Sequence, residues 1–136
     1  MSYENEYELV HEQRKGEILY RLYIAPDDAP VRGNALYSND RATDRKCEDE
    51  ILHRLDAGDT WAWASVKVEA SIADSDVDIT GTSYLGCCSY RNTRGFLRGG
   101  YWPYMMREAL ASLKNHLQTA ADAWNRLERK GKGERV

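Results

Sequence analysis

The feature that most constrains the fold is an alternating pattern in "TWAWASVKVEASIADSDVDITGTSYLGCCSY", residues 60–90. In its first half, apolar side chains occupy every second position from Ala62 to Ile72. A period of two is that of a β-strand, because successive side chains point to opposite faces of a sheet. The segment therefore predicts a strand with one buried face and one exposed face.

A turn signal, "DSD" at positions 74–76, divides this segment and indicates an antiparallel hairpin. The core faces of the two strands must match, so the parity of the register is fixed. The register that we favour pairs three sets of core residues: Ile72 with Ile79, Val66 with Leu85, and Ala64 with Cys87. It predicts that Val66 and Ile72 are buried and that Lys67 and Glu69 are not.

On the opposite face, the same register places Trp61 opposite Tyr90 and Trp63 opposite Cys88. The open end of the hairpin is therefore expected to carry an aromatic cluster on its outer surface. Cys88 is the outward-facing member of the cysteine pair in this register, and Cys87 the inward-facing one. Adjacent strand residues point to opposite faces, so the two thiols are not expected to bind one metal ion together.

Two further elements flank the hairpin. Residues 17–24, "EILYRLYI", alternate with strand-favouring side chains and predict a third strand beside the hairpin. A helix is predicted to begin near Asn39 or Asp40 and to stop at Gly58, because these residue types are preferred at helix termini. Its carboxylates Glu48, Asp49 and Glu50 are expected to form a solvated face.

The last third of the chain predicts a long helix over residues 103–130. Apolar residues recur there at spacings of four and three: Met106, Leu110, Leu113, Leu117, Ala120, Trp124 and Leu127. Such a helix is about 42 Å long, close to the roughly 46 Å of a 14-residue strand, so we expect it to pack along the hairpin. The spacing also permits a seam between two copies, which predicts a monomer or a homodimer through this helix.

These elements predict a single α+β domain over residues 1–136, with a flexible tail at 131–136. The sheet is expected to have about three strands, with the central hairpin at 60–90 and with the long helix and a shorter helix packed on it. No apolar run approaches the roughly 20 residues of a membrane helix. An odd number of cysteines without a secretion signal favours reduced thiols in the cytoplasm. We expect no bound metal and no cofactor, because the histidines have no ligand spacing with the cysteines.

The segment "YRNTRGFLRGGYW", residues 90–102, combines arginines with aromatic residues. The chain carries a net charge of −3, whereas residues 91–136 hold ten basic and four acidic side chains. Arginine and aromatic side chains are typical anchors of protein interfaces, and they also suit the binding of single-stranded nucleic acid. A structural corner with solvated arginines is the third interpretation. The predicted partner-binding residues are Trp61, Trp63, Tyr90, Arg91, Arg94, Arg98 and Trp102.

Three segments, "LDAGDTWAWASVKVEA", "TSYLGCCSY" and "GGYWPYMMREALASL", are similar to a group of small proteins encoded by phages and plasmids. Those proteins share a "W-W-V-V" strand, a "YLG-CSY" strand and a helix beginning "GGY" with a later "M-EA". The similarity spans about residues 55–117. It implies a mobile-element context and a small mixed α/β fold, and it implies no particular activity.

The residues and the resemblance together predict a non-catalytic protein of a phage or other mobile element. We expect it to bind and inhibit a host macromolecular machine through protein–protein interaction, as an anti-CRISPR or anti-restriction protein inhibits a bacterial defence system. The alternative is a single-stranded nucleic-acid-binding protein that uses the arginine and aromatic residues of segment 90–104. Salt dependence separates the two, because phosphate binding weakens steeply with salt.

Overall fold

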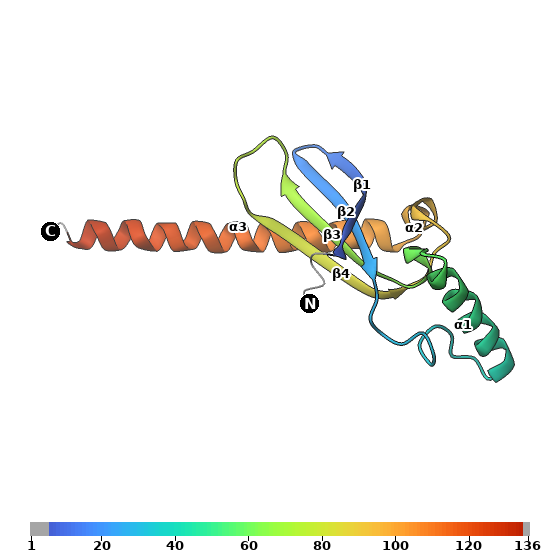
Figure 1. Cartoon of the computed structure of the whole chain (residues 1–136). Coiled ribbons are helices and arrows are strands. Elements are labelled where there is room, and N and C mark those ends of the chain that lie inside the picture. Colours follow the sequence, from blue (N-terminus) through green and yellow to red (C-terminus); the bar gives the residue numbers. More distant parts are fainter. Residues whose placement is uncertain (1–5, 135–136) are drawn as a thin grey trace.

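A computed structural model describes residues 6–134 and shows one antiparallel sheet with a long helix across one face (Figure 1). The strands lie in the order β1-β2-β3-β4. In chain order the elements are β1 (Glu8–Lys15), β2 (Ile18–Pro26), α1 (Arg41–Asp56), a 3-10 turn (Thr60–Ala62), β3 (Ala64–Ile72), β4 (Thr80–Cys88), α2 (Thr93–Arg98) and α3 (Tyr101–Glu134). The α+β class is confirmed, but the sheet has four strands where about three were predicted.

The additional strand is β1, which pairs with β2 along the edge of the sheet. A loop of two residues joins them, and its first residue, Gly16, has a φ of 60°, as a tight hairpin turn requires. On the side of β1 that faces α3, the strand carries polar His11 and Gln13 instead of apolar residues. Both side chains contact Trp102. The strand was not predicted because most of its residues are polar on both faces, so no apolar alternation marks it. Polar residues of this kind are common in edge strands.

The predicted hairpin register is confirmed in its central part and shifted at its open end. Val66 pairs with Leu85 as predicted, but Ala64 pairs with Cys88 because a bulge interrupts the ladder between Ala64 and Val66. A bulge adds one residue to one strand and so reverses which side chains face inward. Cys88 is consequently buried and Cys87 exposed, the opposite of the prediction. Burial raises the pKa of the Cys88 thiol to about 12.

The main core lies between the sheet and α3. Val66 is fully buried, as predicted, and Ile72 is partly buried at the end of its strand. Lys67 and Glu69 remain partly exposed on the other face, as predicted. The ammonium group of Lys67 lies 4.7 Å from the ring centroid of Tyr23, a cation–π contact that covers part of this face.

The helix α3 is longer than the sheet and continues past it into solvent (Figure 1). Met106 and Leu113 are buried against the sheet and Leu117 is partly buried, whereas Trp124 and Leu127 are exposed. The prediction that the whole apolar stripe packs on the core is therefore wrong beyond Leu117. The helix also extends to Glu134, into the segment predicted as a tail, and residues 135–136 lie outside the described residues.

The helix α1 begins and ends close to the predicted residues. The Asp40 side chain caps it by accepting a hydrogen bond from the Ala42 N–H, and Gly58 follows its end with a φ of 86°. Together with the preceding loop, α1 forms a second apolar cluster whose buried members are Val31, Ile51, Ala62 and Trp63. This cluster covers the end of the sheet at which β3 begins.

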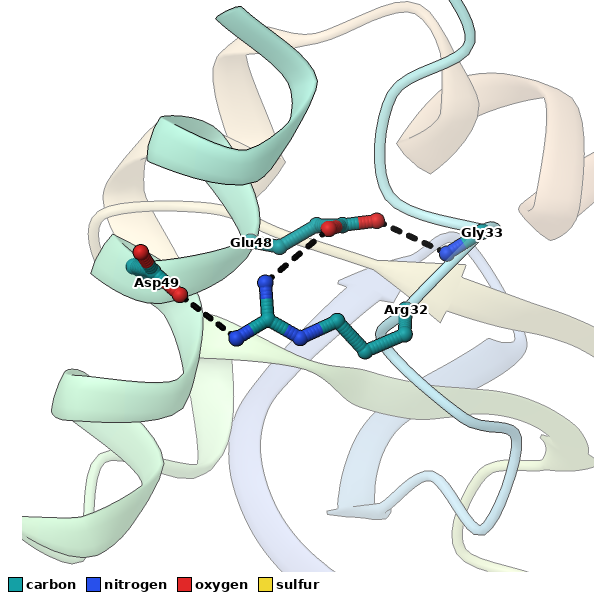
Figure 2. Close-up of polar contacts among 4 residues, drawn as sticks. All are labelled: Arg32, Gly33, Glu48 and Asp49. Carbon is teal, nitrogen blue, oxygen red and sulfur yellow. Dashed lines mark hydrogen bonds and ion pairs between the residues drawn. The ribbon is translucent and has the colours of Figure 1, made fainter. Parts of the chain in front are cut away.

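A clamp of polar contacts fixes the loop before α1 to that helix (Figure 2). Arg32 donates to Glu48 at 3.0 Å and to Asp49 at 2.6 Å, and the Gly33 N–H donates to the second oxygen of Glu48 at 2.7 Å. The prediction of a solvated face is wrong for Glu48, whose residue is only 8% exposed. The Gly33 N–H and the Arg32 guanidinium lower the pKa of the Glu48 carboxyl.

This clamp should make stability depend on pH. Because the pKa of Glu48 is lower in the folded than in the unfolded protein, its contribution is present above the usual glutamate pKa of about 4.3 and is lost as the pH falls. We expect Glu48→Gln to lower the melting temperature at pH 7 and to have a smaller effect at pH 3, where more of the carboxyl is protonated. Thermal unfolding at both pH values measures this difference. Glu50→Gln, an exposed neighbour on α1, should change neither value, and an equal effect of both substitutions would contradict the prediction.

Candidate functional site

The chain between β4 and α3 forms the short helix α2 over Thr93–Arg98. The Asn92 side chain caps α2 by accepting a hydrogen bond from the Gly95 N–H at 2.9 Å. After α2, Gly99 and Gly100 lead directly into α3. The arginines of this segment are therefore placed on and beside a capped helix and not on an irregular loop.

The segment between β4 and α3, called the corner from here on, packs against an aromatic cluster. The rings of Trp61 and Phe96 stack with centroids 5.3 Å apart, and Tyr90 meets both rings edge-on. The predicted pairing of Trp61 with Tyr90 is confirmed, since the Tyr90 N–H donates to the Trp61 carbonyl at 2.9 Å. The Trp61 indole N–H donates to Thr93 in α2. These contacts fix α2 to the end of the hairpin.

Arg54 of α1 ties the same corner to the second apolar cluster. Its guanidinium donates to the Tyr90 carbonyl at 2.6 Å and forms an ion pair with Asp59 at 2.8 Å. The helix α1 and the start of α2 are thus held at fixed positions around the open end of the hairpin. The corner is rigid because hydrogen bonds and aromatic contacts converge on it from three elements.

The structure separates the seven predicted site residues into two groups. Arg91, Arg94 and Arg98 are exposed and Tyr90 is half-buried. The three tryptophans are buried, and each indole N–H has a partner: Thr93 for Trp61, the Ala29 carbonyl for Trp63, and Gln13 for Trp102. The prediction that they join the arginines in one exposed patch is wrong, because α1, the loop before it, α2 and β1 cover them.

Two exposed aromatic residues at this corner were missed. Tyr101 and Tyr104, at the start of α3, are 49% and 50% exposed. With Gly100 and Arg107 they line a shallow hollow. The signal in the sequence was their spacing of three, which places Tyr101 and Tyr104 next to each other on one helix face. We call the combined set the corner surface: Arg91, Arg94, Arg98, Tyr101, Tyr104 and Arg107.

Within residues 6–134, no three or more histidine, cysteine, aspartate or glutamate residues lie close enough together to hold a metal ion. In the same range, no helix combines the length and apolar composition needed to cross a bilayer.

A comparison with protein-family models, curated proteins and solved structures finds no match for the chain. The corner surface is the candidate because it combines exposed arginine and tyrosine side chains with a rigid support.

Proposed function

We propose that the protein is a non-catalytic binding protein of a phage or other mobile element, which inhibits a host machine by occupying one of its surfaces. The target that we propose is a bacterial defence complex in the host cytoplasm, as for anti-CRISPR or anti-restriction proteins. The observation that carries this proposal is the corner surface. It combines exposed arginines and tyrosines, and the helix α2, which carries Arg94 and Arg98, is held by the packing of Phe96 on Trp61 and Tyr90.

The composition of the corner surface supports protein binding. Arginine and tyrosine are enriched among the residues that carry most of the binding energy in protein interfaces. Among the described residues, Arg91, Arg94 and Arg98 form no ion pair within the chain, so their charges are available to a partner. A rigid backbone beneath them reduces the conformational entropy lost on binding.

The mobile-element context rests on the resemblance of residues 55–117 to small phage- and plasmid-encoded proteins. Inhibition of a host machine needs only a surface that competes with the natural partner of that machine. The proposal therefore assigns no reaction and no cofactor to the chain. The protein would act in this way either as a monomer or as a homodimer.

The alternative is that the corner surface binds single-stranded nucleic acid. The exposed rings of Tyr101 and Tyr104 beside Arg107 favour it, because bases stack on aromatic rings while arginines attract the phosphates. The net charge of −3 disfavours it, since non-specific phosphate binding is electrostatic. We therefore rank protein binding first.

A plating assay tests the proposed function. The protein is produced in bacterial strains that each carry one CRISPR or restriction system, and each strain is infected with a phage that its system blocks. We expect plaques to reappear in a strain whose system is inhibited, and not in the same strain carrying an empty vector. If plating stays blocked in every strain although the protein is folded and abundant, the proposal of a defence inhibitor is wrong.

A further inference from the structure

The C-terminal part of α3 extends past the sheet (Figure 1). It carries an apolar face that nothing in residues 6–131 covers. Ala120, Trp124 and Leu127 follow Leu113 and Leu117 at spacings of three and four. They therefore continue the same helix face that packs on β3 and β4. The exposed fractions of Trp124 and Leu127 are 61% and 63%. We call Ala120, Trp124 and Leu127 the α3 stripe.

A partner that covers this face would stabilise the projecting segment of α3. The segment from residue 118 to Glu134 is about 25 Å long. Helices in proteins gain most of their stability from packing of an apolar face, and the apolar face of this segment is exposed in the described part of the chain. The α3 stripe is the face of this segment that a partner would cover.

We propose that the partner is a second copy of the chain, and that the two α3 helices pair antiparallel through their stripes. The direction follows from the geometry of one copy. The α3 stripe lies on the same side of the helix as the sheet, so a parallel pair would place both sheets in the space between the helices. An antiparallel pair places the two sheets at opposite ends of the paired helices. The α3 stripes of the two copies then meet around Trp124.

The distribution of charge supports the antiparallel direction. The His116 side chain donates to the Thr80 carbonyl at 2.8 Å, so the loop before β4 stands where α3 leaves the sheet. This loop is acidic and exposes Asp76 and Asp78. From residue 126 to residue 131, the projecting end of α3 exposes three basic side chains, Arg126, Arg129 and Lys130, against one acidic side chain, Glu128. Antiparallel pairing brings the basic end of each copy to the acidic loop of the other.

Sedimentation equilibrium tests the pairing. We expect the full chain to have twice the 15.6 kDa mass of one chain at micromolar concentration. Trp124→Glu combined with Leu127→Glu should raise the dimer Kd at least about 100-fold, because each copy loses two apolar anchors. Both side chains are exposed in one copy, so circular dichroism should show an intact fold. The matched control is Asn125→Glu, which adds a negative charge next to Trp124 but off the stripe.

A charge exchange tests the direction. Replacing Asp76 and Asp78 by lysine should weaken the dimer several-fold, and adding Arg126→Glu with Lys130→Glu should restore it. A monomeric wild type, an unchanged dimer in the stripe variant, or equal dissociation by Asn125→Glu would overturn the pairing. Weakening without restoration would overturn the antiparallel direction.

Discussion

Replacing Gly81 with alanine is expected to lower the free energy of unfolding by about 3 kcal/mol or more. Gly81 is buried in β4 where α3 crosses the sheet. A Cβ at this position would overlap backbone atoms of α3, namely the Ala109 carbonyl oxygen, the Leu113 nitrogen and, at 2.7 Å, the Leu113 Cα. Backbone atoms cannot rotate away, so α3 would have to move off β4. Urea denaturation followed by circular dichroism measures the loss.

The matched control for this prediction is Gly100→Ala. A Cβ at Gly100 would meet no atom within 4 Å, so we expect a change within about 0.5 kcal/mol. If Gly81→Ala were as mild as Gly100→Ala, the close approach of α3 to β4 would be wrong. The position of α3 on the sheet would then be wrong, and so would the position of the corner surface.

Phe96→Ala is expected to destabilise the protein by about 3–5 kcal/mol, the range for removal of a buried phenylalanine ring. Phe96 is fully buried, stacks on Trp61 and meets Tyr90 edge-on. Its loss would leave a cavity beneath α2 and remove the ring contacts that hold the corner together. Chemical denaturation of the variant measures the effect.

Tyr101→Ala is the comparison for Phe96→Ala, since it removes an aromatic ring from the same corner. Tyr101 is half exposed, so its removal should cost far less than that of Phe96. Similar small losses in the two variants would mean that the cluster beneath α2 is not packed. The argument that the corner surface is rigid would then fail.

The fold could be predicted where alternation and capping signals are strong. The period of two from Ala62 to Ile72 located β3 and its buried face, and Asp40 and Gly58 located the ends of α1. The bulge near Ala64 could not be predicted, because the same amino-acid sequence is compatible with regular pairing of β3 and β4. That single inserted residue exchanged the predicted environments of Cys87 and Cys88.

The candidate site was predicted in part. The sequence placed Arg91, Arg94 and Arg98 at the open end of the hairpin, and the pairing of Trp61 with Tyr90 is confirmed. Burial of Trp63 and Trp102 depends on contacts with residues far away in sequence, Ala29 and Gln13, that no local pattern reveals. The exposed Tyr101 and Tyr104 could have been found from helical spacing.

Capture of a partner by the corner surface tests the account most directly. The wild-type protein and the triple variant Arg91→Ala, Arg94→Ala, Arg98→Ala are immobilised and exposed to bacterial lysate, with and without nuclease treatment. The three side chains are exposed, so the variant should keep its melting temperature. We expect the wild type to retain a host protein after nuclease treatment. The variant should lose it, since one anchoring arginine contributes about 2 kcal/mol or more. Equal capture by the folded variant, or capture that disappears with nuclease, would contradict the account.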